Sequence, residues 1–214
     1  MKEKSIIFRG DGVLAILEDR KNQTRRVITE KWQLCRSPED EPEWFVEQCP
    51  YGKIGDRLWV RETWTIHEVS IDALKPIVFI DYRADGLTNE IPVNLEEAER
   101  MAILLERLEE SGNGNDNWQP SIFMPRWASR ITLEIKHVRI MRLQNISFRD
   151  CLAEGIKDEI CLIASGQPIP YEIAVKIARD RFRELWDSIN LKRGYGWETN
   201  CWVWRITFRR IMEE

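Results

Sequence analysis

The chain has 214 residues, of which 43% are hydrophobic and ten are Trp, and it carries a formal net charge of −4 at pH 7. This length suits one large domain, or one small domain with an insertion, and this apolar fraction is ample for a packed core. There is no run of about 18 apolar residues, which excludes a predicted membrane span, and the apolar part of the first segment is too short for a signal peptide. We therefore expect a cytoplasmic protein without a membrane partner.

Short mixed elements are predicted for the first part of the chain. Residues 5–8 suit a strand and residues 12–19 a helix, with residues 21–26 on the loop that leaves this helix. Residues 31–51 are polar and contain Pro, which is typical of irregular chain. A Gly-Asp turn then leads into residues 58–64, whose side chains alternate with the period of a strand.

The middle of the chain, residues 65–117, reads as an insertion. Within it, residues 77–82 are a strand candidate, residues 95–110 are helical and acidic, and the Gly- and Asn-rich residues 112–117 predict a flexible loop. Residues 118–127 then re-enter the main body as extended chain interrupted by Pro.

The last part of the chain predicts a strand over 131–140, a helix over 170–189 and a closing strand over 201–209. Between them, a capping box at 147–150 opens a short helix, and Gly155 suits its end. For the helix over 170–189, the predicted buried side consists of Ile173, Ile177, Phe182, Leu185, Trp186 and Ile189. Scattered strands with two or three helices around them indicate the α+β class, in the form of a small mixed β-barrel.

The negative charge is concentrated in one segment. Residues 65–117 contain four Lys or Arg against twelve Asp or Glu, whereas residues 118–150 contain six against two. This distribution permits a local phosphate-binding strip but not a strongly basic nucleic-acid binder. We expect the acidic segment to lie outside any nucleic-acid surface.

The five cysteines occur at wide spacings and form no Cys-x-x-Cys pair. In a reducing compartment this pattern indicates free thiols. Cys35, Cys49 and His67 lack the spacing of a metal site. The cysteines are therefore expected to be small buried hydrophobes, and neither a metal ion nor another cofactor is expected.

A cluster of cations occurs in the segment Lys21-Asn22-Gln23-Thr24-Arg25-Arg26. Packing alone gives no reason for three cations in six residues. Anion recognition does, because an Arg fork matches the oxygens of phosphate or carboxylate and a Lys amine supplies a point charge. The alternative interpretation is a solvated basic turn after a helix.

Four motifs occur in order along the chain: Lys21-x-x-Thr24-x-Arg26, Gly55-Asp56-Arg57-Leu58-Trp59-Val60, Ala153-Glu154-Gly155-Ile156 and the strand Trp202-Val203-Trp204-Arg205-Ile206-Thr207-Phe208. Together they resemble the ASCH domain, a relative of the PUA RNA-binding fold. The long, Trp-rich version here is similar to the phage- and prophage-encoded branch. The resemblance implies one PUA-like domain over 1–214, a small mixed β-barrel with flanking helices and the acidic insertion 65–117.

The same resemblance implies a catalytic group. In the acetylcytidine amidohydrolases of this family, a Lys, a Thr three residues later and a distant Glu act together, and Lys21, Thr24 and Glu154 match them. A Thr hydroxyl needs a neighbouring base to become a nucleophile, and a Lys either serves as that base or stabilises an oxyanion. Glu154 ends a predicted helix, where the dipole opposes its charge, and this suits proton transfer. Taken alone, it reads as an exposed helix-end Glu.

Further side chains are candidates for holding the ligand by charge or by stacking on bases. They are Arg25, Arg26, Arg57, Arg61, Trp64, Arg126 and Trp127. The leading hypothesis is an ASCH-type protein that binds RNA, single-stranded DNA or a modified nucleoside, with deacylation of a cytidine base or RNA cleavage as the hydrolytic forms. The alternatives are a recognition module without turnover, and a phage adaptor that docks a protein through residues 96–110. The sequence does not decide whether the protein is an enzyme.

Overall fold

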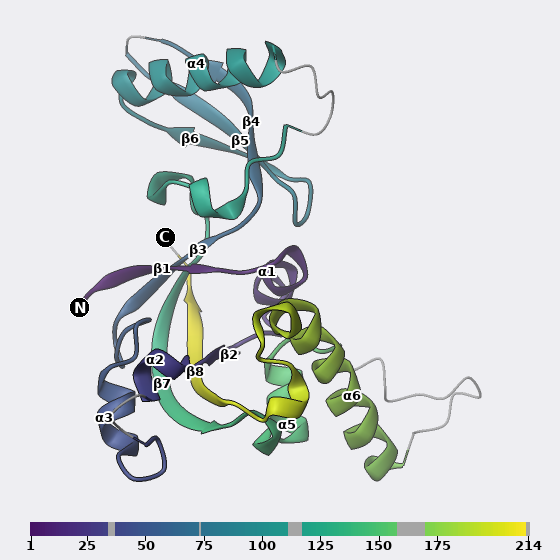
Figure 1. Ribbon diagram of the computed structural model, residues 1–214. Coiled ribbons are helices and arrows are strands. Elements are labelled where there is room, and N and C mark those ends of the chain that lie inside the picture. Colours follow the sequence, from purple (N-terminus) through teal and green to yellow (C-terminus); the bar gives the residue numbers. More distant parts are fainter. Residues whose placement is uncertain (34–36, 73, 111–116, 158–169, 213–214) are drawn as a thin grey trace. The chain divides into compact units, whose positions relative to one another are not determined.

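The computed structural model describes residues 1–33, 37–72, 74–110, 117–157 and 170–212. The chain forms two compact units (Figure 1). Unit 1 comprises residues 1–4, 15–58 and 133–214, and unit 2 comprises residues 5–14 and 59–132. Within the described ranges, every helix is too short or too polar to span a membrane.

The helices and strands alternate irregularly along the chain. The strands are β1 (Glu3–Ile7), β2 (Gln23–Val27), β3 (Arg57–Arg61), β4 (Trp64–Ser70), β5 (Ile77–Tyr82), β6 (Thr88–Pro92), β7 (Thr132–Arg142) and β8 (Trp202–Ile211). The α-helices are α1 (Gly10–Leu17), α2 (Glu30–Gln33), α3 (Pro42–Glu47), α4 (Leu95–Glu110), α5 (Phe148–Ala153) and α6 (Tyr171–Asn190). Short 3₁₀ turns cover Ser121–Phe123, Arg126–Ala128, Leu143–Asn145, Leu191–Arg193 and Trp197–Thr199.

The described strands form two sheets, one in the order β1-β3-β7-β8-β2 and one in the order β4-β5-β6. This confirms the predicted α+β class. The predicted closed barrel is wrong, because β1 and β2 are the two unpaired edges of an open five-stranded sheet. Side-chain alternation along a strand shows which face is buried, but closure depends on strand tilt and stagger, which alternation does not encode.

β2 corrects the prediction of a loop over residues 21–26. It pairs antiparallel with β8, and the register places Arg25 opposite Arg205 and Thr24 opposite Ile206. Directly opposed residues share one face of a sheet, and neighbouring residues alternate between faces. Gln23, Arg25 and Val27 therefore share one face. The strand was missed because its residues are polar on both faces, and its pairing partner lies far away in sequence.

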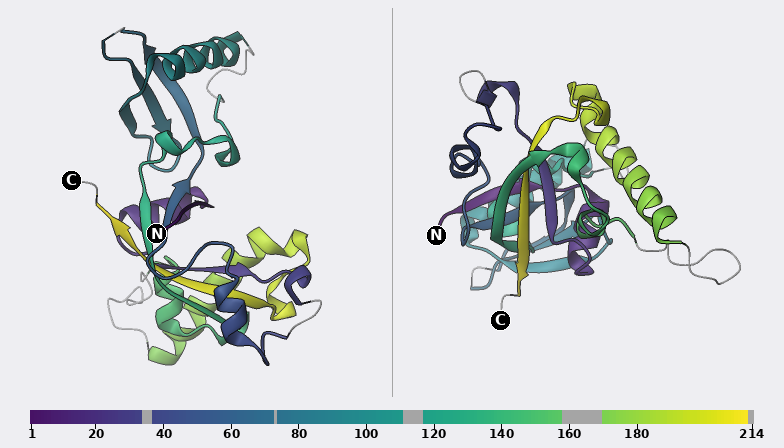
Figure 2. Two further views of the ribbon diagram at one scale, coloured as in Figure 1. Left: turned by 90° about the vertical axis from the view of Figure 1, so that its left-hand side faces the viewer. Right: turned by 90° about the horizontal axis from the view of Figure 1, so that it is seen from below.

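Both faces of this part of the sheet are covered within unit 1 (Figure 2). On the face of Val203 lie α5 and α6, which contribute Cys151, Phe182 and Trp186 to the same core cluster. On the opposite face, the indole Nε1 of Trp204 donates to the Phe45 carbonyl of α3 at 3.0 Å. Two short helices, α2 and α3, thus occupy a region that was predicted to be irregular, residues 31–51.

The boundaries of α5 confirm the capping prediction. Asp150 N–H donates to the Ser147 hydroxyl at 3.1 Å, and Ser147 N–H donates to the Asp150 carboxylate at 3.3 Å. Gly155 follows the C-cap residue with φ of +94°. A Cβ atom at Gly155 would lie 2.8 Å from the Ala15 Cβ, so the position needs glycine for space as well as for backbone conformation.

α6 buries part of the predicted side, since Phe182 and Trp186 are buried and Ile177 packs on the same core cluster. Its buried residues, four positions apart, are Ala174, Ala178, Phe182, Trp186 and Asn190. Ile173 and Ile189 are 49% and 41% exposed, so their assignment to the buried side was wrong. The small Ala174 and Ala178 side chains let the helix approach α5 and the sheet closely. The prediction missed these two positions because it considered only large apolar side chains.

Unit 2 contains the β4-β5-β6 sheet with α4 against it. The strand Ile77–Tyr82 and the helix Leu95–Glu110 match the predicted ranges. The predicted strand over 58–64 is split between β3 and β4, and β6 was not predicted. The core of this unit includes Trp64, Ile66, Ile80, Tyr82 and Met101.

Cys49 and Cys151 are free and buried, and Cys201 is free and half-buried. Burial raises the pKa of the Cys151 thiol to about 11. The buried positions of Cys49 and Cys151 agree with the predicted role of small hydrophobes. Cys35, Cys161 and all but the last residue of the predicted loop over 112–117 lie outside the described residues.

Candidate functional site

Lys21 and Glu154 meet where the chain enters β2 and leaves α5. Their backbones form an antiparallel bridge, and Asn22 N–H donates to the Ala153 carbonyl at 3.0 Å. The Lys21 Nζ lies 2.8 Å from the Glu154 Oε2 and 2.7 Å from the Glu154 carbonyl oxygen. Each side chain is only 5% exposed, so the pair is withdrawn from water.

Arg25 joins this pair to a second carboxylate. Its Nη1 lies 3.0 Å from the Glu154 Oε1, and its Nη2 lies 3.0 Å from the Asp150 Oδ2. The guanidinium also lies over the Phe182 ring, with 5.7 Å from its carbon to the ring centroid. Because the Arg25 side chain is fully buried, both carboxylates are held by a cation that has no access to solvent.

Arg205 extends the arrangement across the sheet. Its Nη2 lies 2.9 Å from the Asp150 Oδ1, and its Nε donates to the Gln23 side-chain oxygen. The result is a continuous ion-pair chain, made of Lys21, Glu154, Arg25, Asp150 and Arg205 in that order. It contains three cations and two carboxylates, so its electrostatic balance favours an added anion or a polarised carbonyl.

The buried surroundings shift the pKa values of the groups in this chain. Burial lowers the pKa of Lys21, the attraction of Glu154 raises it in part, and the repulsion of Arg26 and Arg25 lowers it further. For Asp150, burial raises the pKa, but Arg25, the Ser147 N–H and Arg205 together outweigh burial and hold the pKa below its usual value. Asp150 is thus kept as a carboxylate.

The Arg205 end of the ion-pair chain borders a small cavity. Its volume is about 180 Å³, and it is lined by His137 and Arg139 of β7 and by Arg205 and Thr207 of β8. Among these lining residues there is no carboxylate, and two carry a permanent positive charge. This cavity, which we call the sheet pocket, can therefore accept phosphate or carboxylate oxygens.

Thr24 and Arg26 lie on the other face of β2. The register places Thr24 opposite Ile206 and Arg26 opposite Trp204, and this is the face covered by α3. Thr24 is buried, and the Arg26 guanidinium lies 5.8 Å from the Tyr51 ring centroid. Burial lowers the pKa of Arg26, while Tyr51 and then Glu154 raise it in part.

The remaining predicted ligand contacts are spread over both units. Arg57 lies in unit 1 and is half-buried, whereas Arg61, Trp64, Arg126 and Trp127 belong to unit 2. Trp64 is 2% exposed in the core of unit 2, so its ring faces are covered by protein.

The other predicted ligand contacts of unit 2 interact with protein groups of the same unit. The Trp127 Nε1 donates to the Glu97 carboxylate at 3.0 Å. Arg61 and Arg126 lie over the Trp59 ring, at 5.2 Å and 6.0 Å from its centroid.

Sequence reasoning missed Asp150 as a site residue, and it missed Arg205, His137 and Arg139 as well. Asp150 was assigned only to the capping box, a role that it does have. Arg205 carried a usable signal, since it is a charged residue between apolar neighbours in a closing strand. The sequence contains no such signal for His137 and Arg139, because polar residues on one face of a strand usually point to solvent.

Comparisons with known proteins do not extend these observations: no protein-family model, curated protein or solved structure matches this chain.

Proposed function

We propose that unit 1 is an ASCH-type, PUA-like module that binds a base-containing ligand, namely RNA, single-stranded DNA or a modified nucleoside. The observation that supports this proposal is the buried contact between Lys21 and Glu154, two residues of separate ASCH-like motifs. The excess of positive charge in the ion-pair chain, and the cationic sheet pocket at its end, suit a ligand that carries phosphate or carbonyl oxygens.

A hydrolytic form of this function has a simple chemistry. In the deacylation of an acylated cytidine, a hydroxyl or water oxygen attacks the amide carbonyl, and the Lys21 ammonium stabilises the oxyanion that forms. Glu154 accepts the proton of the attacking oxygen and passes it to the exocyclic amine as the C–N bond breaks. When water attacks, the acyl group leaves directly as a carboxylic acid, and when a hydroxyl attacks, a water molecule then hydrolyses the acyl ester. Lys21 and Glu154 are held 2.8 Å apart, so an amide that reached one of them would also meet the other.

Recognition without turnover is a second candidate, and one observation favours it. The β2 register places Thr24 on the face opposite Arg25, and the two oxygens of Glu154 each contact a cation. A carboxylate held in this way is a good fixed acceptor, and a Thr on the other face is poorly placed to act with Arg25 on one ligand. These features suit a rigid binding site.

The test measures binding and turnover with the unmodified chain. Fluorescence anisotropy with labelled single-stranded RNA and DNA, together with calorimetry with N-acetylcytidine, should detect binding of at least one ligand. Arg139→Gln should weaken it about tenfold, which corresponds to about 1.4 kcal/mol for one charge-assisted contact. Arg181→Gln, on an exposed position of α6, is the matched control and should bind normally. If none of the three ligands binds, the proposal fails.

Turnover is scored separately by chromatography of the ligands after incubation. Release of cytidine or of RNA fragments, abolished by Lys21→Ala in protein that remains folded, supports the hydrolytic form. Binding without any product supports recognition alone.

A further inference from the structure

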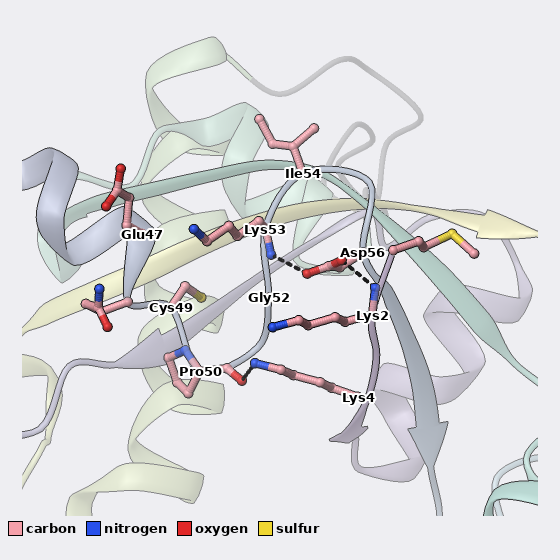
Figure 3. Close-up of a pocket in the computed structure, with 11 residues that line it drawn as sticks. Lys2, Lys4, Glu47, Cys49, Pro50, Gly52, Lys53, Ile54 and Asp56 are labelled. Carbon is pink, nitrogen blue, oxygen red and sulfur yellow. Dashed lines mark hydrogen bonds between the residues drawn. The ribbon is translucent and has the colours of Figure 1, made fainter.

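Unit 1 contains a second and larger cavity, which shares no lining residue with the sheet pocket. Its volume is about 520 Å³, and it lies between the start of β1 and the segment 47–56 (Figure 3). We call it the lysine cavity, after Lys2, Lys4 and Lys53, which all line it. A volume of this size is typical of small-molecule sites, for which about 300–1,000 Å³ is usual.

The walls of the lysine cavity are held in place by Asp56. Its Oδ1 accepts the Lys2 N–H at 2.7 Å, and its Oδ2 accepts the Lys53 N–H at 3.0 Å. These two N–H groups lower the pKa of Asp56. On the far side, the Lys4 Nζ donates to the Pro50 carbonyl at 2.8 Å. The backbone that surrounds the cavity is thus ordered before any ligand enters, which reduces the entropic cost of binding.

Positive charge faces the cavity from two segments of the chain. Lys2 and Lys4 are two residues apart and extend side by side, and Lys53 comes from the facing turn (Figure 3). Among the described residues, no hydrogen-bond or ion-pair partner is found for the Lys2 and Lys53 ammonium groups. They are therefore available to a ligand.

The carboxylates near these ammonium groups offset only part of their charge. Both Asp56 oxygens are engaged by backbone N–H groups, and Glu47, the other acidic lining residue, is exposed to solvent. The three lysines thus outnumber the two carboxylates on the cavity wall. Phosphate oxygens are the ligand that such an arrangement suits, because ammonium groups bind phosphate as point charges without a fixed geometry.

We propose that the lysine cavity binds the phosphate group of a nucleotide-sized ligand. The source of the phosphate is either a free anion, such as a nucleotide or pyrophosphate, or the backbone of a nucleic acid. The proposal does not rest on the Lys21–Glu154 site, because the two cavities have no residue in common.

The test is an NMR titration of the full chain, labelled with ¹⁵N, with pyrophosphate and separately with a short single-stranded RNA. Amide signals of Gly52, Lys53 and Gly55 should shift on titration. The Lys2→Gln/Lys53→Gln double variant keeps the backbone N–H groups that hold Asp56, so it should fold normally. Its affinity should fall about tenfold, because two exposed charge pairs with the phosphate are lost.

The matched control is Lys176→Gln/Lys192→Gln, which removes the same charge from exposed positions of unit 1 outside the cavity. It should bind as the unmodified chain does. If pyrophosphate shifts these amide signals and added RNA does not displace it, the site binds a free anion. If both probes shift the same signals and compete with each other, the site binds a nucleic-acid phosphate. The proposal is overturned if neither probe shifts these amides, or if both double variants lose affinity equally.

Discussion

Lys21 and Glu154, which are 133 residues apart in the sequence, form a buried ion pair with 2.8 Å between Nζ and Oε2. The pair joins the start of β2 to the end of α5. Arg25 forms two further ion pairs beside it, one with Glu154 and one with Asp150. Breaking a buried pair leaves a charge that water cannot reach, so these residues should matter for stability as well as for binding.

Glu154→Gln should lower the free energy of unfolding by about 3–5 kcal/mol, because it leaves the Lys21 and Arg25 cations without their shared carboxylate. Urea unfolding followed by circular dichroism measures this change. Glu184→Gln on the exposed side of α6 is the control and should stay within about 0.5 kcal/mol of the unmodified chain. A loss below 1 kcal/mol for Glu154→Gln would mean that the pair is open to solvent in solution.

Gly155→Ala should destabilise the chain more than Gly194→Ala does. Both glycines have positive φ, +94° and +84°, so an alanine meets similar backbone strain at each. Only at Gly155 would the new Cβ also lie 2.8 Å from the Ala15 Cβ and 3.3 Å from the Lys21 Cβ.

We expect a loss of about 1 kcal/mol at Gly194 from backbone strain, and a further 1–3 kcal/mol or so at Gly155 from overpacking. Urea midpoints of the two variants at one pH provide the comparison. Equal losses would show that the contact with Ala15 relaxes without cost.

The acid stability of the chain should depend on Asp150. Its pKa is lowered in the folded state, so its contribution is complete above the unfolded-state value of about 3.9 and is lost as pH falls through the lower folded-state value. Asp150→Asn should therefore reduce the free energy of unfolding by about 1–3 kcal/mol at pH 7. The difference from the unmodified chain should shrink as pH falls below about 4.

Denaturant unfolding at a series of pH values between 7 and about 3 tests this dependence. Asp180→Asn, on an exposed position of α6, serves as the control and should show no such convergence. A difference for Asp150→Asn that stays constant over the whole series would mean that the capping role of Asp150, and not its charge, accounts for the loss.

The buried side of α6 can be tested with two truncations. Phe182→Ala should lower the free energy of unfolding by about 3–5 kcal/mol, because Phe182 is 2% exposed and packs on Trp186 and Trp197. Ile173→Ala should cost less than about 1 kcal/mol, since Ile173 is 49% exposed. Thermal or urea unfolding distinguishes the two, and a larger loss for Ile173→Ala would mean that Ile173 lies on the buried side, as the sequence predicted.

Elements that depend on neighbouring residues were predicted well. The capping box of Ser147 and Asp150, the stop at Gly155, the strand Ile77–Tyr82 and the helix Leu95–Glu110 all follow from spacings within a few residues. Such patterns act through local hydrogen bonds, backbone conformation and periodic burial, which the sequence encodes directly. The pairing of the polar strand β2 with β8 does not follow in this way, because its residues show no apolar alternation.

The sequence by itself determined the α+β class and the local ends of α5, and its resemblance to the ASCH domain made Lys21 and Glu154 candidates. Only the tertiary structure decided that Asp150 and Arg205 complete an ion-pair chain with them, that Thr24 faces away from Arg25, and that the sheet is open. The physical reason is that a buried charge is stable only beside a partner. Which distant residue becomes that partner depends on strand register and on which side of α5 meets the sheet, and neither is a property of neighbouring residues.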